Sequence, residues 1–420
     1  MILVCIITVV LAVTVLAGTG SGASESSAFD QLLAMKDQLP LSGLQPLHLD
    51  SRKNIEKALP KHQKRNLTIG WTGASLGSTF FTEMMSSANV AAKKYNYKML
   101  YQNANFDIQK QYTHIDTFIS QKVDVLVVNA VDMAATLQYY KRAVAAGIPV
   151  IVTGPTAGKP DYPIVTTFLS GSYEPGFQVG LYTAKKMWKA GHVLKVGFTE
   201  SDLGYADANS RPCGFIGGYL YQSHIMAGKP YASKWDAALE GYNDWIKVKD
   251  QGKFNDTAND LDFVGYGVGG GTDPASGQKA ASDLLTAHPD INVLVVEEDS
   301  QFRGVIKEIQ QHNLVPGKDI ILVAPADATK EGMEYVKNGT VLAVASNCPY
   351  YDGEAVINLI HRIFEENFDA TNLPVNSYTP TACITKENLA QFYDPKVAFA
   401  KALPWKVQTI DEYNAANAKK

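Results

Sequence analysis

A glycine-rich stretch, VGYGVGGGTDPASGQKA, has the spacing that most directly suggests nucleotide chemistry in this sequence. Gly265, Gly267 and Gly270 have the G-x-G-x-x-G pattern of loops that place the pyrophosphate of NAD or FAD at a helix N-terminus. Here, however, Asp273 followed by Pro274 predicts an N-cap and the first residue of a helix. A carboxylate at that cap would occupy the amides that a phosphate needs. We therefore predict a tight loop whose glycines adopt positive φ, and no cofactor.

Polar and aromatic side chains follow the apolar runs of the chain, where they could bind a small molecule. Phe80 and Phe81 follow the first run, and neighbours on a helix point about 100° apart. We expect one of these rings to face a ligand, while packing of both in the core is the alternative. Asn129 ends a later run, and its amide can donate and accept hydrogen bonds at once.

In the second half of the chain, the residues that follow the apolar runs are more often acidic. The candidate binding residues there are Glu298, Asp299, Asp327 and Asn347. No Ser, Cys or Thr lies in a recognisable nucleophile elbow, and no histidine near a run end has an obvious carboxylate partner. The histidines and cysteines also lack metal-ligand spacing. We therefore predict neither an enzyme nor a metal site.

Short apolar runs alternate with amphipathic stretches, which predicts parallel sheets covered by helices. One set of runs is 67–72, 97–101, 123–129 and 149–153, and a second is 193–199, 261–268, 292–297 and 319–324. Between the runs, Asp107 is a predicted N-cap for a helix with apolar residues at helical spacing. The pattern predicts two doubly wound α/β lobes, and ligands of such sheets bind beyond the carboxyl ends of the strands.

Composition excludes several classes of protein. The chain has 420 residues, 46% of them hydrophobic, with a net charge of −4, which is typical of a globular protein without a nucleic-acid partner. Residues 2–17 form a continuous apolar block followed by Gly, Ser and Ala. We interpret residues 1–22 as a signal peptide, which predicts a periplasmic or secreted protein. No Lys or Arg precedes the block, so a signal-anchor is the alternative. For Cys213, Cys348 and Cys383 we favour free thiols over a disulfide.

Several motifs occur in the order seen in one known family. IPVIVTG (148–154), VDVLVVNAVD (123–132), ASDLLTAHPDINVLVVEED (281–299) and ITKENLAQFY (384–393) make the chain resemble type I periplasmic solute-binding proteins of the ribose, galactose and xylose group. The resemblance covers about residues 67–395. It implies two lobes joined by a three-strand hinge, with crossings near 166–171, 345–349 and 374–380. It also implies an interlobe cleft that closes on a ligand, and a membrane permease as partner.

The resemblance also assigns the site by position. Phe80 and Phe81 match the family's paired aromatics, Asn129 its first-lobe amide and Asp327 an Asp that binds sugar hydroxyls. Ser170 matches a residue just after the first crossing, and Asn347 matches an amide near the hinge. Asn209 stands at the position of an arginine in the family's second lobe, with Arg211 two residues later. Glu298 stands where sugar binders usually have Asn, and Asp299 matches the Asp that follows it. Gly154-Pro155 stands where sugar binders often carry an Asp-Arg pair.

We therefore expect the following organisation: a signal peptide (1–22), a linker and N-terminal extension (23–66), an N-terminal lobe (67–167 and 348–377), a C-terminal lobe (168–347 and 378–395) and a tail (396–420). Residues 220–260 are an insertion relative to compact members of the family. The insertion and the extension could form a docking surface for a membrane sensor.

The acidic residues that follow the apolar runs, with few positive charges beside them, disfavour an anionic ligand. We expect a small neutral or cationic ligand, a monosaccharide or polyol above all, bound for ABC transport. The alternative is a receptor subunit that passes ligand occupancy to a membrane sensor. A nucleotide-dependent enzyme and a DNA-binding regulator are disfavoured, the latter because of the predicted export signal and the absence of a helix-turn-helix pattern before residue 67.

Overall fold

The computed structural model describes residues 22–44, 59–60, 64–77, 79–154, 162–401, 403 and 405–417. The predicted signal peptide lies outside these residues except for Gly22. Among the helices that are described, none is long and apolar enough to cross a membrane.

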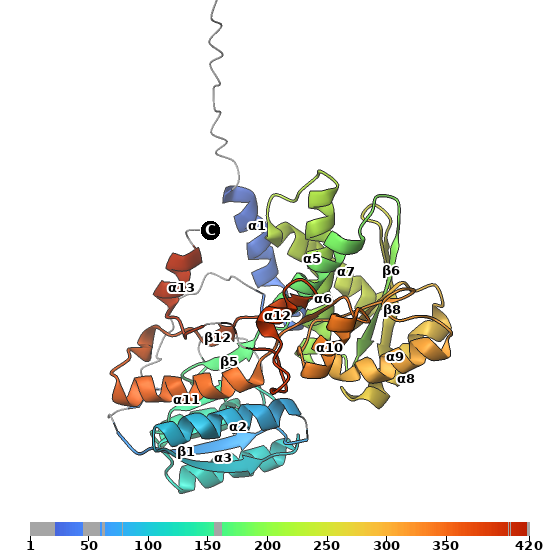
Figure 1. Cartoon of the computed structure of the whole chain (residues 1–420). Coiled ribbons are helices and arrows are strands. Elements are labelled where there is room, and N and C mark those ends of the chain that lie inside the picture. Colours follow the sequence, from blue (N-terminus) through green and yellow to red (C-terminus); the bar gives the residue numbers. More distant parts are fainter. Residues whose placement is uncertain are drawn as a thin grey trace, which may run out of the picture.

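The N-terminal lobe (N lobe) contains a six-stranded sheet in the order β12-β5-β4-β3-β1-β2, in which every neighbouring pair is parallel. Its strands are β1 Thr68–Gly73, β2 Lys98–Asn103, β3 Val125–Asn129, β4 Val150–Thr153, β5 Thr167–Ser170 and β12 Asn376–Thr379. Its helices are α2 Thr79–Lys94, α3 Ile108–Ser120, α4 Leu137–Ala145 and α11 Pro349–Glu365. Figure 1 shows α2 and α11 side by side in this lobe, and both contribute to one apolar core.

The C-terminal lobe (C lobe) contains a seven-stranded sheet in the order β13-β11-β10-β9-β6-β8-β7, parallel except for the two edge strands. Its strands are β6 Leu194–Glu200, β7 Phe254–Asp256, β8 Leu261–Val268, β9 Val293–Val296, β10 Ile321–Ala324, β11 Ala343–Ala345 and β13 Cys383–Thr385. Its helices are α5 Tyr173–Met187, α6 Ala206–Met226, α7 Lys234–Gln251, α8 Pro274–Ala287, α9 Phe302–Gln311, α10 Lys330–Asn338 and α12 Leu389–Phe392, with a 3-10 turn, η3, at Asp299–Gln301.

The predicted fold class is confirmed, and each predicted run overlaps a strand with ends that differ by at most two residues. The predicted N-caps are also confirmed. Asp107 accepts hydrogen bonds from the amides of Gln109 and Lys110 at the start of α3, and Asp273 accepts from those of Ala275 and Ser276 at the start of α8.

Three crossings join the lobes. The chain passes from β5 to α5, from β11 to α11 and from β12 to β13, in each case between one sheet and the other lobe. β5 and β12 extend the N-lobe sheet to Ser170 and Thr379, beyond the predicted boundaries at 167 and 377. The third crossing accordingly lies between Thr379 and Cys383, so it begins within the predicted range of 374–380 and extends beyond it.

The N-terminal extension packs on the C lobe. Its helix α1 (Gly22–Ala34) and 3-10 turn η1 (Leu39–Leu41) lie against α6 and α7 (Figure 1). The rings of Phe29 and Trp235 have centroids 5.0 Å apart, and Lys249 Nζ is 2.9 Å from Asp37 Oδ2. Because α7 lies within residues 220–260, the predicted extension and insertion pack against each other.

The extension also reaches the first crossing. The Ser42 carbonyl accepts a hydrogen bond from the Tyr173 amide at 2.9 Å. Gly43 has φ +83°, and a Cβ at this position would lie 2.2 Å from Gly171 Cα. Only glycine fits such a close backbone approach at positive φ.

The C-terminal tail connects the lobes once more. The Ala400 amide donates to the Ala328 carbonyl of the C lobe at 2.9 Å. Trp405 then packs edge-on against Phe168 of the N lobe, with ring centroids 6.0 Å apart. Val407 is buried in the N-lobe core, and helix α13 (Ile410–Asn417) follows.

Candidate functional site

Arg211 is the centre of the polar cluster at the strand ends of the C lobe. It lies in the second turn of α6, and its side chain is only 3% exposed. Its Nη1 lies 3.2 Å from Glu298 Oε1 and 3.8 Å from Glu297 Oε1, and its Nη2 lies 3.7 Å from Asp207 Oδ2. One guanidinium therefore contacts three carboxylates.

The close packing of α5 on α6 holds Arg211 in this position. A Cβ on Gly180 would lie 2.0 Å from the Phe215 carbonyl oxygen, and one on Gly218 would lie 1.9 Å from that of Phe177. The two helix backbones are in direct contact, so α6 and its arginine have little freedom to shift.

Burial dominates the electrostatics of the cluster. It raises the pKa of Glu297 to about 8, against the lowering effect of Arg211. It raises the pKa of Asp327 well above its ordinary value, with Glu298 adding to the rise. The pKa of Glu200 is likewise raised by burial and by Glu297, and both of its carboxylate oxygens lack a hydrogen-bond partner among the described residues. For Arg211, burial would lower the pKa, but the surrounding carboxylates raise it.

Asp327 and Asn347 meet at the ends of β10 and β11. Asn347 Nδ2 donates to Asp327 Oδ1 at 3.1 Å. Asp327 is 6% exposed, and Asn347 Oδ1 is buried without a hydrogen-bond partner among the described atoms. Both side chains therefore keep acceptor capacity, which fits their predicted role in binding.

Asp299 has a different role in this structure. Its Oδ1 accepts from the Asp327 amide at 3.2 Å, and its Oδ2 accepts from the Thr329 amide at 2.7 Å and hydroxyl at 3.0 Å. Burial raises its pKa to about 7. Asp299 thus positions the loop that carries Asp327, and the predicted ligand contact is not supported.

Asn209 is also placed away from the cluster. It is fully buried, and its Nδ2 donates to the carbonyls of Leu203 and Tyr205, both at 2.8 Å. Its Oδ1 accepts from Trp245 Nε1 at 3.3 Å. These hydrogen bonds of the Asn209 side chain hold the start of α6 against α7. Ligand binding through Asn209 is therefore not supported. Arg211, two residues later, occupies the cluster instead.

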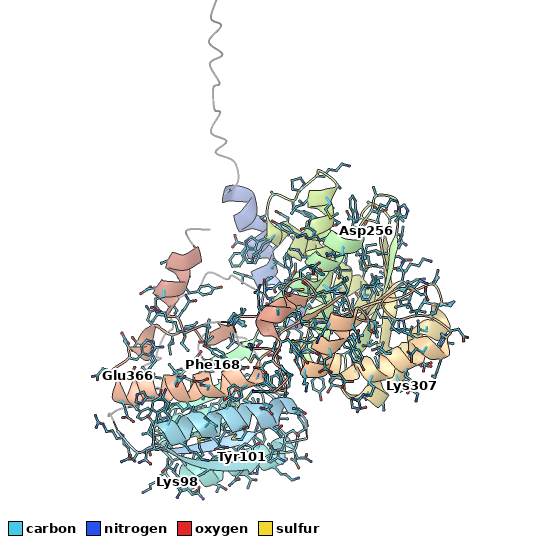
Figure 2. All side chains as sticks on the ribbon, viewed as in Figure 1. Lys98, Tyr101, Phe168, Asp256, Lys307 and Glu366 are labelled. Carbon is cyan, nitrogen blue, oxygen red and sulfur yellow. The ribbon has the colours of Figure 1, made fainter. Side chains whose placement is uncertain are left out.

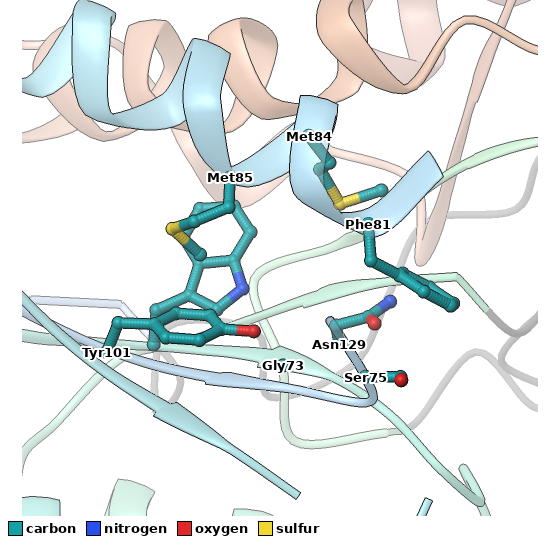
Figure 3. Close-up of a pocket in the computed structure, with 8 residues that line it drawn as sticks. Gly73, Ser75, Phe81, Met84, Met85, Tyr101 and Asn129 are labelled. Atoms are coloured by element: carbon teal, nitrogen blue, oxygen red, sulfur yellow. The ribbon is translucent and has the colours of Figure 1, made fainter. Parts of the chain in front are cut away.

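The N-lobe half of the candidate site contains Phe81 and Asn129. Figure 3 shows Phe81 from α2 and Asn129 from the end of β3 at a small cavity of about 10 Å³, room for about one water. Asn129 Oδ1 accepts from the Ala74 amide at 3.1 Å, and its Nδ2 donates to the Thr153 carbonyl at 3.2 Å. One amide hydrogen of Asn129 is left for a ligand.

The two predicted aromatics contact each other edge-on, with ring centroids 5.4 Å apart, but have different further neighbours. Phe81 lines the cavity beside Asn129, whereas Phe80 packs edge-on against Phe399 of the tail, with ring centroids 6.3 Å apart. The ring of Phe106 also contacts Phe81 at 5.9 Å. Phe106 is 60% exposed and has φ +55°, a rare conformation for an aromatic residue. Phe106 was not among the predicted residues, because no family motif marks the loop after β2.

Ser170 lies at the first crossing. Its hydroxyl is 2.9 Å from that of Thr379 on the third crossing. Ser172 donates a hydrogen bond to Asp207, which in turn lies beside Arg211. Ser170 is therefore part of the hinge, and the hinge is linked to the acidic cluster through Ser172 and Asp207.

Glu200, Asp207 and Glu297 are site residues that sequence reasoning did not select. Each is next to a strand end or helix start, so position alone was the available signal. What the sequence does not show is that Asp207 and Glu297 lie 3.7 and 3.8 Å from Arg211, and that buried Glu200 interacts electrostatically with Glu297 and Arg211.

Two further features of the C lobe, an acidic cluster and a cavity, lie outside the candidate site. Glu240, Asp244 and Asp256 place carboxylate oxygens within 4.8 Å of one another, and Figure 2 shows Asp256 on the C lobe, away from Lys98 and Tyr101 of the N lobe. Lys247 pairs with Asp244 at 2.7 Å, and Tyr231 donates to Glu240 at 2.7 Å, so we assign no metal there. A cavity of about 320 Å³ lies beside Gly265 and His288, at the C-terminal end of α8 rather than at the strand ends.

The polar groups of each half of the candidate site are bonded within their own lobe. Asn129 makes its side-chain hydrogen bonds within the N lobe, whereas Glu298 and the Asp327–Asn347 pair make theirs within the C lobe. Phe399 of the tail contacts both lobes, because its ring packs against Phe80 and its backbone bridges to Thr329. The predicted site residues thus form two half-sites, one on each lobe.

Comparison with known proteins agrees with this geometry. The family described as "Periplasmic binding protein domain" matches residues 69–367. The ribose import binding protein RbsB of Bacillus subtilis is 24% identical over 304 residues, covering 71% of this chain and 83% of that protein. RbsB of Escherichia coli is 24% identical over 310 residues, covering 74% and 88%.

Solved structures share the fold. An ABC transporter solute binding protein from Mycobacterium smegmatis with bound glycerol has a TM-score of 0.61 at 20% identity, covering 80% of this chain and 99% of that chain. One from Bacillus halodurans with bound myo-inositol has a TM-score of 0.59 at 19% identity, covering 78% and 96%. Since the family match spans most of the described chain and both lobes have the expected topology, this protein belongs to the periplasmic binding protein family, in its type I form.

Proposed function

We propose that this protein is an exported, non-enzymatic receptor that captures a small sugar or polyol between its lobes and delivers it to an ABC permease. The observation that carries the proposal is the pair of half-sites, one at the strand ends of each lobe. Each retains unused hydrogen-bonding capacity, in Asn129 on one side and in Asp327 and Asn347 on the other. Hinge closure would bring the two halves onto one ligand.

The ligand class follows from the chemistry of the half-sites and from the relatives. Carboxylates and amides bind hydroxyl groups, and an aromatic ring such as that of Phe81 covers the C–H face of a sugar. The relatives are ribose import proteins, and the neighbouring structures contain glycerol and myo-inositol. Isothermal titration calorimetry against pentoses, hexoses and polyols tests this function. Binding of sugar phosphates or sugar acids alone would contradict it.

Asp327→Ala is the sharpest variant for this proposal. It removes a buried acceptor and leaves ligand hydroxyls and Asn347 unpaired, at about 1–3 kcal/mol per unpaired group, which is roughly 10- to 100-fold in affinity per group. Asp319→Asn, in the exposed loop before β10, is the matched control and should bind as the wild type does. Unchanged affinity of Asp327→Ala would remove Asp327 from the site.

A sensing role is the second candidate, and one observation favours it. The extension and the insertion, both additional to compact family members, pack together through α1 and α7 on the C lobe. Such a surface could contact a membrane sensor. Chromosomal neighbours separate the two roles: a permease and an ATPase indicate transport, whereas a sensor kinase or chemoreceptor indicates signalling.

A further inference from the structure

The C-lobe half-site has a large excess of acidic groups. Six carboxyl groups interact with one another or with the single guanidinium of Arg211: Glu200, Asp207, Glu297, Glu298, Asp299 and Asp327. Asp299 is committed to the loop at Thr329, and Glu297 accepts hydrogen bonds from the amide and hydroxyl of Ser201. Asp207 is half exposed and accepts from Ser172, and burial raises the pKa of Glu200. Glu298 and Asp327 remain, beside a guanidinium that Glu297 and Asp207 also share.

Glu298 and Asp327 are the members of this group that can reach a ligand. The Glu298 side chain is 21% exposed. Glu297 and Asp327, which also follow strands β9 and β10, are buried. Its Oε1 faces Arg211 at 3.2 Å, and its Oε2 has only a 3.4 Å contact from Ser300. Ser300 has a better acceptor in the Thr272 carbonyl, at 2.6 Å, so Glu298 Oε2 is effectively free.

The N-lobe half-site has the opposite character. Its cavity is lined by uncharged residues only: Trp71, Gly73, Ser75, Phe81, Met84, Met85, Tyr101 and Asn129. A ligand held between the halves would therefore meet neutral and aromatic groups on one side and an excess of carboxylates on the other.

An ammonium group matches the acidic side better than a hydroxyl does. It carries three donors and no acceptor, and its charge offsets carboxylates that would otherwise be buried unpaired when the cleft closes. Charge-assisted hydrogen bonds are also about twice as strong as neutral ones. A hydroxyl supplies one donor and leaves the charge excess in place.

We propose that this cleft selects ligands that carry a protonated amine, such as amino sugars or amino polyols, and that Glu298 and Asp327 receive the ammonium group. The proposal rests on the function proposed above and narrows its ligand class. Glu298 is the residue that sets the preference, because its side chain is partly exposed and its Oε2 is effectively free.

The test is calorimetry with matched ligands at a pH where the amine is protonated. The probes are glucosamine, glucose and N-acetylglucosamine, together with glucamine and sorbitol. We expect the amine of each set to bind about tenfold or more tighter than its hydroxyl or acetylated counterpart. Preferential binding of the neutral sugars would overturn this inference and leave the proposed function standing. Binding of none of the five probes would count against both.

Two variants at opposite ends of β9 sharpen the test. Glu298→Gln keeps the shape of the side chain and should abolish the preference for the amine. Asp290→Asn removes the same charge before β9, at the other edge of the sheet, where Asp290 pairs with exposed Lys195. It should leave the preference unchanged. An amine preference that survives in Glu298→Gln, or is lost equally in both variants, would overturn the assignment. Thermal melting of each variant confirms that it is folded.

Discussion

The two lobes have the same α/β architecture but opposite chemistry at their strand ends. In the N lobe, Asn129 joins β1, β3 and β4 through neutral hydrogen bonds, and the nearby cavity is apolar and aromatic. In the C lobe, buried Arg211 contacts Asp207, Glu297 and Glu298. The difference shows that one fold can hold the side chains at its strand ends either by neutral hydrogen bonds or by a cluster of carboxyl groups around an arginine. We call these two sets of strand ends the neutral wall (N lobe) and the charged wall (C lobe), and we expect them to respond differently to mutation and pH.

Arg211→Met should have the largest effect on stability. It removes the cation that compensates several buried carboxylates, and breaking a buried ion pair costs about 3–5 kcal/mol. Urea unfolding measures the loss. Arg303→Met is the matched control in the same lobe, because Arg303 pairs with Glu331 on the surface at 2.9 Å, where an ion pair contributes at most about 1 kcal/mol. Equal losses in the two variants would contradict the compensating role of Arg211.

The contribution of Glu297 to stability should also fall as pH rises from about 4.5 to about 8. A carboxyl group whose pKa is higher in the folded than in the unfolded state stabilises the fold below its unfolded pKa, and this stabilisation is lost as pH rises through the folded pKa. Burial raises the pKa of Glu297 from 4.5 to about 8. Glu297→Gln should therefore flatten the pH profile of the melting temperature. A slope identical to that of the wild type would show that Glu297 is not the titrating group.

Asn129→Ala tests the neutral wall and should have a smaller effect. It leaves the Ala74 amide without its acceptor, which costs about 1–3 kcal/mol. Because no charge is involved, the loss measured by urea unfolding should be the same at about pH 5 and at about pH 8, whereas the loss for Arg211→Met should change with pH, since the carboxyl groups around Arg211 titrate. A loss in Asn129→Ala that changes with pH would contradict the neutral character of the N-lobe wall.

Gly43→Ala should have the smallest effect on stability. The new Cβ would clash with Gly171 at the first crossing, and alanine is strained at φ +83°. We expect the extension to detach locally from the hinge, with faster hydrogen exchange at the Tyr173 amide, which now donates to Ser42. Gly228→Ala has a similar φ of +72° with no neighbour within 4 Å, so it is the control for strain alone. Equal exchange at Tyr173 in both variants would contradict the contact.

Sequence patterns predicted the two-lobe fold well because long apolar runs such as 123–129 are specified locally. The pattern of apolar runs did not mark β5, β12 and β13, which are only three or four residues long, although the resemblance placed hinge crossings near β5 and β12; it did not mark the edge strand β7 either. β5, β12 and β13 form at the crossings only because neighbouring strands and the other sheet surround them. Tertiary context, rather than local propensity, decides such segments.

The site could be predicted only as a set of positions. Glu298, Asp327 and Asn347 lie together at the strand ends of the C lobe, as position suggested. Asn209 and Asp299 also lie next to strand ends or helix starts. However, Asn209 accepts a hydrogen bond from Trp245, and Asp299 accepts one from the Thr329 amide. Whether a polar side chain faces the ligand or the scaffold depends on partners far away in sequence, and a single sequence does not reveal them.

The tail has a practical consequence for anyone preparing a shorter form of this protein. The family match ends at residue 367, yet Trp405 covers Phe168 and stacks edge-on with Tyr351, at centroid distances of 6.0 and 5.8 Å. A chain cut to the family-matched core would expose these rings to solvent as an apolar patch prone to aggregation. Purification yields of truncated forms should therefore drop sharply once the cut passes Val407.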